Sequence, residues 1–255
     1  MKFKLKQEKL ETLLEKLMVK DILPSSVISA KSDKLFSVQR EEHARALRFL
    51  SVNKSYFEEF ECEKEESIEI DVPTVLAVVK KVLPNTMLTI ETKKNKLVIS
   101  GENVNIKLTV RDPEGEVIKK FPFEVSNGIP LIGDDKIPLG IHFSLAVSDF
   151  KDIAHFGSSL KTEFYEFDLK KGKINVKVGD VLGVNDSITF TPPSRHIKSG
   201  KALSVIFAYG IQQIAATFQN DVEIKTATDS PGWFYEQTTD YTLGILIPPY
   251  TDEDE

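Results

Sequence analysis

The sequence has few cysteines and histidines, which are common catalytic and metal-binding residues. It contains one cysteine, Cys62, and four histidines, which are His43, His142, His155 and His196. A single cysteine excludes a disulfide within the chain, and its acidic surroundings raise a thiol pKa rather than lower it. The histidines are too scattered for a metal-ligand spacing such as His-x-x-x-His, and there is no glycine-rich phosphate loop. We therefore expect a protein that is not an enzyme and that uses neither a metal nor a cofactor.

The chain also lacks long apolar stretches. No run approaches the ~20 residues that a membrane-spanning helix requires. The N-terminal segment MKFKLKQEKLETLLEKL is charged throughout, unlike a secretion signal. These absences predict an intracellular protein without membrane contact. The formal net charge of -6 argues against nucleic-acid binding over the whole surface, but it leaves room for a local basic patch.

What the chain does contain is one supersecondary pattern in four copies. Each copy is a strand, an amphipathic helix and a hairpin or meander of alternating strands. The copies begin near Met1, Ser67, Pro138 and Lys201, roughly 65 to 70 residues apart, and a fixed period is typical of repeat architecture. Four repeats predict two similar domains. We place these over residues 1–112 and 138–255, the second with an acidic tail, and a proline- and glycine-rich connector over 113–137.

Hydrophobic periodicity predicts the fold class. In the first repeat Leu10, Leu13, Leu14 and Leu17 fall on one helical face. Between the helices the period changes to two, as in Asn103–Arg111, and turn residues separate the alternating segments. Antiparallel sheets with two short helices in each domain predict the α+β class.

Local signals predict where the other three helices begin and end. The second starts at Pro73, which suits a first helical turn, and ends at Pro84 and Asn85. A hydroxyl cap from Ser148 starts the third. Apolar spacing predicts the fourth over residues 207–218.

Several short motifs stand in an order that matches one known family. They are Glu42–Leu47 (EHARAL), Tyr56–Glu61 (YFEEFE), Ser67–Val72 before the second helix, Asp229–Pro231 (DSP), and Leu246–Pro248 (LIP) before the acidic tail. With these motifs the chain resembles a DNA sliding clamp of the proliferating cell nuclear antigen family, in its archaeal and eukaryotic form. The resemblance covers nearly the whole length and extends to divergent or viral members.

The resemblance implies a ring. Three protomers of two similar domains close head to tail, since heterologous interfaces form rings when the rotation closes. Helices line a central hole through which duplex DNA passes without being read for sequence. Such a clamp is placed on DNA by a clamp loader, and it tethers DNA polymerase and other replication and repair enzymes without catalysis. A homotrimer is expected, with a heteromeric ring as the rival.

The resemblance predicts which basic residues face DNA. Lysine contacts to phosphate hold a polyanion without reading its sequence. The expected lining residues are Lys9, Lys16, Lys20, Lys80, Lys81, Lys151, His155, Lys198 and Lys201. Glu8, Glu11 and Glu15 interrupt this positive lining, and the fourth helix carries no basic residue. The plainer interpretation of each lysine is an ordinary solvated charge.

Two protein-binding surfaces are also implied. A partner peptide with hydrophobic anchors would dock on His43, Ala44, Ala46, Leu131, Ile132, Leu139, Pro231, Ile245, Ile247 and Pro248. The protomer interface would pair the strand carrying Val104, Ile106, Leu108 and Val110 with a second-domain strand carrying Ile188 and Phe190. An apolar edge strand left open is an aggregation hazard, which favours pairing, whereas Pro192 and Pro193 shorten the partner strand.

Two other functions stay open from the residues alone. One is a clamp-fold paralogue with a specialised role in checkpoint or transcription work. The other is an α+β scaffold protein with no DNA role. The mass in solution separates the clamp from these two alternatives. A stable species of three chains supports the clamp, whereas a strict monomer favours the others.

Overall fold

The computed structural model describes residues 1–19, 22–41, 46–113, 123–126, 129–132, 136–170, 172–179, 186–193 and 203–250. The chain folds as two compact units. Unit 1 comprises residues 1–40, 48–121 and 237–243, and unit 2 comprises residues 41–47, 122–236 and 244–255. Neither unit is one continuous segment. The sequence-based boundaries at 112 and 138 stay a prediction.

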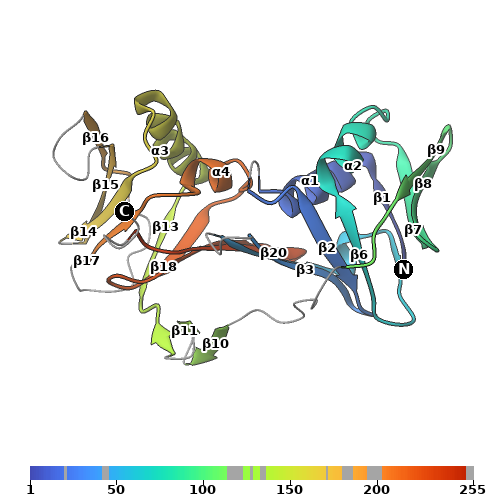
Figure 1. Ribbon diagram of the computed structural model, residues 1–255, viewed down its shortest axis with the longest axis horizontal. Helices are drawn as coiled ribbons and strands as arrows, with labels where there is room; N and C mark the ends of the chain where they lie inside the picture. The colour runs from blue at the N-terminus through green and yellow to red at the C-terminus, as the bar shows by residue number, and fades with distance from the viewer. Residues whose placement is uncertain are drawn as a thin grey trace. The chain divides into compact units, whose positions relative to one another are not determined.

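The first half of the chain carries two antiparallel sheets and two helices (Figure 1). Its elements are β1 (Lys2–Lys6), α1 (Gln7–Leu17), β2 (Ser25–Ala30), β3 (Lys34–Arg40), β4 (Leu47–Asn53), a 3-10 turn (Lys54–Tyr56), β5 (Glu59–Glu61), β6 (Glu66–Asp71), α2 (Val72–Val79), β7 (Met87–Lys93), β8 (Lys96–Gly101) and β9 (Val104–Thr109). One sheet has the strand order β5-β1-β7-β8-β9, and β4, β3, β2 and β6 are successive neighbours in the other. Strand β9 therefore ends its sheet.

The second half repeats this arrangement after a small extra sheet. Its elements are β10 (Phe123–Ser126), β11 (Ile129–Ile132), β12 (Ile137–Pro138), β13 (Ile141–Leu145), α3 (Val147–Leu160), β14 (Tyr165–Lys170), β15 (Lys173–Gly179), β16 (Ser187–Phe190), β17 (Leu203–Phe207), α4 (Ile211–Ala215), β18 (Val222–Thr226), β19 (Gly232–Gln237) and β20 (Tyr241–Ile247). The sheet orders are β10-β11-β12, β16-β15-β14-β17 and, for neighbouring strands, β13-β18-β19-β20. Here β16 ends its sheet.

The fourfold pattern predicted from the sequence is confirmed. Each copy opens on a strand that leads into a helix: β1 into α1, β6 into α2, β13 into α3 and β17 into α4. Helices α1 and α2 contact each other in unit 1, as α3 and α4 do in unit 2 (Figure 1). Antiparallel sheets with few short helices confirm the α+β class.

The amphipathic pattern of α1 survives in the structure. Leu10, Leu13, Leu14 and Leu17 are all 3% exposed or less. A leucine side chain buried to this degree contributes about 1.5–3 kcal/mol relative to an exposed one. The leucine face therefore anchors α1 in the core of unit 1 and leaves its other face to carry charge.

The predicted bounds of α2 need one correction. Asp71 caps the helix, with its carboxylate accepting the N–H of Thr74 at 2.8 Å, and Pro73 lies in the first turn as expected. The helix ends at Val79 rather than at Pro84 and Asn85. The turn that follows is held by backbone bonds of Lys81 and Val82 to carbonyls in the last turn. These shorter-range bonds replace the helical ladder before the proline is reached.

The helices of unit 2 need two further corrections. The cap of α3 is Ala146, without a side-chain bond, and Ser148 lies inside the first turn. The fourth helix is Ile211–Ala215 rather than 207–218. Phe207 belongs to β17, and Gly210 turns the chain with φ 90°, a conformation that favours glycine. Apolar spacing alone could not reveal that break.

The connector is more ordered than a bare linker. Its described residues form β10, β11 and β12, in which Phe123 pairs with Ile132 and Leu131 pairs with Pro138. The sequence predicted an extended segment here but not its pairing.

Candidate DNA-facing helices and partner surfaces

The charged face shared by α1 and α2 is the first candidate site. Lys80 at the end of α2 is flanked by two carboxylates of α1, with its Nζ 3.1 Å from Glu15 and 3.5 Å from Glu11. Its side chain is 47% exposed. The hydrogen bond to Glu15 and the charges of both glutamates raise the pKa of Lys80. The lysine is therefore an accessible cation that already has an anionic partner.

A buried glutamine holds one of those carboxylates in place. The side-chain amide of Gln7, which is 3% exposed, donates to Glu11 at 3.0 Å and to the carbonyl of Val79 at 3.2 Å. Gln7 thus joins α1 to the end of α2 beneath the charged face. Because Glu11 accepts from Gln7 through one oxygen and faces Lys80 with the other, its carboxylate is fixed rather than free to rotate away.

Lys9 is also engaged within unit 1. Its Nζ donates to the carbonyl of Tyr56 at 2.9 Å and lies 5.1 Å from the centroid of the Tyr56 ring. The Tyr56 hydroxyl in turn donates to the carbonyl of Lys9 at 2.7 Å. Burial, and then the charge of Asp240, raise the pKa of Tyr56. This reciprocal contact tethers Lys9 but leaves it half-buried rather than enclosed.

The prediction that Lys16 lines an open surface is wrong. Lys16 is 1% exposed, and its Nζ lies 4.4 Å from the centroid of the Tyr241 ring. A lysine can bury its apolar stem and place its ammonium group on an aromatic face. Lys16 therefore belongs to the interior of unit 1. Lys81, one residue beyond Lys80, is exposed and makes no ion pair with the residues described.

The helices of unit 2 carry few charges. Lys151 and His155 are exposed on α3, where Asp152 is exposed beside them. On α4, Gln212 reaches back to α3, where its side chain accepts from Ser158 at 3.0 Å. The structure thus keeps Lys151 and His155 as candidates. The remaining predicted lining residues lie outside the described residues: Lys20, Lys198 and Lys201.

The candidate peptide surface lies in unit 2. Leu131 and Ile132 on β11 are half-buried, Pro231 is half-buried and Pro248 is exposed. Four other predicted members are 1% exposed or less, and these are Ala46, Leu139, Ile245 and Ile247. Those four side chains fill the core and could support a docking surface but not form its open wall. The last two, His43 and Ala44, lie outside the described residues.

One polar cluster on the β13-β18-β19 sheet was not predicted from the sequence. The Tyr235 hydroxyl donates to Glu223 at 3.1 Å, His142 also bonds that carboxylate, and Lys225 Nζ lies 5.3 Å from the Tyr235 ring centroid. Burial, then the Glu223 charge, raise the pKa of Tyr235. Residues that alternate along a strand share one face of the sheet, which applies to Glu223 and Lys225 on β18. Only the strand register brings Tyr235 beside them, because Glu223 pairs with Tyr235.

The predicted interface strands are both sheet edges. On β9, Val104, Ile106 and Leu108 are half-buried, and Val110 just beyond it is 5% exposed. On β16, Ile188 and Phe190 are half-buried. The Phe190 ring packs against Phe156 of α3, with centroids 5.8 Å apart. Among the described strands each has a neighbour on one side only, so each offers a row of backbone donors and acceptors on its other side.

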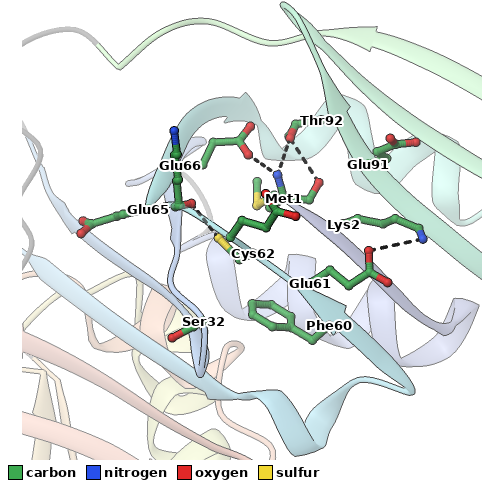
Figure 2. A pocket seen from close by; sticks show the side chains of 12 residues that line it. Met1, Lys2, Ser32, Phe60, Glu61, Cys62, Glu65, Glu66, Glu91 and Thr92 are labelled. Carbon is green, nitrogen blue, oxygen red and sulfur yellow. Dashed lines mark hydrogen bonds and ion pairs between the residues drawn. The ribbon is translucent and has the colours of Figure 1, made fainter.

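An open pocket of about 880 Å³ lies in unit 1 beside Cys62 (Figure 2). The Met1 amino group bonds Glu66 and Thr92, and Lys2 faces Glu61 at 3.5 Å. The Cys62 thiol donates to the carbonyl of Lys64 at 2.9 Å. Partial burial, together with Glu66 and Glu65, raises the Cys62 pKa, which disfavours the nucleophilic thiolate.

Two further features are absent from the part of the chain that the structure describes. It contains no group of three or more His, Cys, Asp or Glu side chains placed to hold a metal ion. Among the same residues there is likewise no helix long and apolar enough to cross a membrane.

Comparison with known proteins identifies the fold. No protein-family model matches the sequence, and no curated protein sequence matches it either. Among solved structures, proliferating cell nuclear antigen (PCNA) from Entamoeba histolytica aligns with a TM-score of 0.81 at 14% identity over 98% of both chains. A. fulgidus PCNA, solved with the C-terminal region of FEN-1 bound, aligns with 0.76 at 13% identity over 98% of both. PCNA from Thermococcus kodakaraensis gives 0.76 at 14% identity over 98% of this chain and 99% of that one. The chain therefore has the PCNA sliding-clamp fold, as its motifs predicted.

Proposed function

We propose that this protein is a sliding clamp, which encircles duplex DNA and tethers DNA polymerase and other replication and repair enzymes. The observation that carries the proposal is the end-to-end match to PCNA structures, which leaves almost no part of either chain unaligned. A shared fold does not by itself assign a function. The proposal therefore also rests on what the helix faces, the β11 surface and the sheet edges offer chemically.

The helix faces suit a weak, sequence-independent contact with DNA. Lys9, Lys80, Lys81, Lys151 and His155 are at least partly exposed on the helices or at their ends. Contacts of lysine to phosphate position a duplex without reading its bases. Such contacts are also readily exchanged, which a protein that slides along DNA requires. We place Lys81 and Lys151 first, because neither makes an ion pair with the described residues.

The β11 surface suits a short hydrophobic peptide. Leu131 and Ile132 present half-buried apolar side chains from a small sheet, with the exposed Pro248 and half-buried Pro231 in the same unit. A few apolar anchors supply most of the affinity in such contacts. One of the similar clamps was solved with the C-terminal region of FEN-1 bound, which supports peptide-bearing partners for this chain too.

The two sheet edges suit ring assembly. In this proposal β9 of one protomer pairs with β16 of the next, so that both edges are covered and the assembly closes as a homotrimer. Pro192 and Pro193 follow β16 and cannot donate ladder hydrogen bonds, which limits the length of the joint. A heteromeric ring built with a second clamp chain is the alternative assembly. Loading onto DNA then requires a clamp loader that opens the ring.

Two measurements test the proposal. Light scattering behind size-exclusion chromatography should give the mass of three chains. Protein loaded on nicked circular DNA should stay bound at high salt and be released when the circle is linearised, because topological linkage does not depend on charge contacts. A strict monomer would overturn the homotrimer, and retention that linearisation does not change would overturn the clamp. We expect no catalysis and no cofactor, and an intracellular site of action where DNA is replicated.

A clamp-fold paralogue is the second candidate function. The observation that favours it is the set of carboxylates on α1, because Glu8, Glu11 and Glu15 offset the lysines of the same face. A weakly basic lining suits a ring whose work in checkpoint or transcription depends mainly on its protein partners. In a processivity assay, a replicative clamp lengthens the products of its polymerase, and such a paralogue does not.

A further inference from the structure

The α1–α2 face contains an internal competitor for DNA phosphate. Lys80 lies between the carboxylates of Glu15, at 3.1 Å, and Glu11, at 3.5 Å. A phosphate oxygen that binds Lys80 would take the place that Glu15 occupies. It would also approach the negative charges of Glu11 and Glu15, both of which are partly exposed.

The carboxylates that compete with phosphate are held in place by other contacts. Glu11 is held by Gln7, whose buried amide also bonds the end of α2 at Val79. An isolated surface ion pair is weak because two long side chains lose freedom when they meet. Here one carboxylate has already lost that freedom to Gln7, and Lys80 has a second carboxylate as an alternative partner. The pairing is therefore more persistent than a single exposed contact.

We infer that Glu11 and Glu15 set how strongly unit 1 holds duplex DNA, by occupying the ammonium group of Lys80. This inference rests on the proposed DNA-encircling function and adds a regulating element to it. It gives Lys80 and Lys81 different roles, although they are neighbours. Lys81 contacts phosphate directly, whereas Lys80 does so only when its carboxylate partners give way.

The raised pKa of Lys80 agrees with this arrangement. The hydrogen bond to Glu15 that favours the charged form of Lys80 also occupies one of its N–H donors. We infer that this arrangement gives the clamp short-lived contacts with DNA. A clamp that must slide gains from lysines that release phosphate easily, and a neighbouring carboxylate speeds that release. Salt dependence should reflect it, because a lysine that is neutralised internally releases no counterion from DNA.

The test uses the full chain and a short, fluorescently labelled linear duplex, with binding followed by anisotropy over a series of salt concentrations. The variants are Glu15→Gln and the double variant Glu11→Gln/Glu15→Gln, which keep side-chain shape and the acceptor used by Gln7. Each is also made in a Lys80→Met background. We expect roughly threefold to tenfold tighter binding at low salt for the double variant, and a salt slope steeper by about 0.9.

Glu8→Gln is the matched control. Glu8 lies on the same helix and carries the same charge, but its carboxylate accepts the backbone N–H of Asn85 at 3.1 Å rather than pairing with Lys80. If the glutamates act through Lys80, neutralising them should raise DNA affinity much less in the Lys80→Met background. The gain that remains there is the effect of removing negative charge in general. An equal gain in both backgrounds, or a Glu8→Gln gain as large as that of Glu15→Gln, would overturn the inference.

The outcome also separates this inference from the proposed function. If the wild type binds the duplex and the variants bind no more tightly, the inference about Glu11 and Glu15 is wrong. The proposed clamp function is then unaffected. Failure of the wild type and of every variant to bind duplex, even at the lowest salt, overturns the inference, whereas the clamp itself stands or falls with retention on circular DNA. Glu15→Gln alone guards against a folding defect, because Glu15 lacks the link to Gln7 that Glu11 has. Thermal melting of each variant checks that point.

Discussion

The ammonium group of Lys16 lies over the ring of Tyr241, 4.4 Å from its centroid, in the interior of unit 1. The two residues lie near opposite ends of the sequence. They meet because the segment 237–243 packs with unit 1. This contact removes Lys16 from any surface that DNA could reach. It also makes Lys16 a useful contrast to the exposed Lys81, which follows the next helix.

Lys16→Ala and Lys81→Ala should therefore have opposite signatures. Loss of the buried stem of Lys16 should lower the free energy of unfolding by about 1–3 kcal/mol, with no change in the salt slope of DNA binding. Lys81→Ala should change stability by less than about 0.5 kcal/mol and lower the slope by about 0.9. Urea unfolding and anisotropy titrations measure the two quantities. A weakened salt slope in Lys16→Ala would show that its ammonium group reaches phosphate after all.

The sequence predicted the features that depend on local periodicity. The leucines of α1 recur at helical spacing, so their shared buried face needs no knowledge of the rest of the chain. The edge positions of β9 and β16 came from the family resemblance, and the sheet orders agree with them. Pro73 likewise predicted the first turn of α2 through short-range chemistry, whereas the cap by Asp71 came only from the structure.

The errors arose where distant residues decide the outcome. Nothing near Lys16 in sequence indicates that Tyr241 will cover it. The ion pairs of Lys80 require α1 and α2 to be neighbours, and residue spacing does not reveal that. The fourth helix was predicted too long because apolar residues at 207, 211 and 214 fit its period. The left-handed backbone of Gly210 nevertheless separates a strand from a helix there.

Gly157 on α3 should not tolerate a side chain. A Cβ built at this position would overlap with the hydroxyl of Tyr165. Tyr165 is 1% exposed and cannot move into solvent without leaving the core. Gly157→Ala should therefore destabilise the protein by about 1–3 kcal/mol, as overpacking does. Gly140→Ala is the control, because no atom lies within 4 Å of its Cβ position. Equal unfolding midpoints for the two variants would contradict this packing.

Tyr165 should also make the protein sensitive to alkali. Burial raises the pKa of Tyr165 from 10.0 to about 12. A group whose pKa is raised in the folded state stabilises that state below its unfolded pKa and loses the contribution as pH rises through the folded pKa. Stability should therefore fall between pH 10 and about 12, by up to roughly 2–3 kcal/mol from this residue.

Tyr165→Phe is the variant that isolates this effect, since it keeps the ring and removes the ionisable hydroxyl. Urea unfolding at neutral pH and near the upper end of that range should show a smaller loss for the variant than for the wild type. Tyr56 and Tyr235, whose pKa values are also raised by burial, keep a residual loss in both. Identical pH profiles would mean that Tyr165 is not protected from water.

The β11 residues offer the most direct test of partner binding. The double variant Leu131→Ala/Ile132→Ala removes two half-buried apolar side chains from a strand that pairs with both β10 and β12. It should weaken the binding of a partner's hydrophobic peptide by at least tenfold, because anchor residues typically cost more than about 1 kcal/mol each when truncated. Assembly and DNA retention should stay at the wild-type level. Unchanged affinity in isothermal calorimetry would remove β11 from the peptide surface.

The edge strand β9 should decide whether protomers assemble. Ile106 is half-buried and pairs with Ile99 of β8, whereas Lys107 beside it is exposed on the opposite face. Ile106→Lys places a charge on an apolar edge, a device that native proteins use to prevent edge pairing. The long lysine stem can still cover Ile99, so the unit should remain folded. Scattering should then report monomers for Ile106→Lys and the wild-type mass for Lys107→Ala. A full-size assembly from Ile106→Lys, with an unchanged melting temperature, would place the joint between protomers elsewhere than on β9.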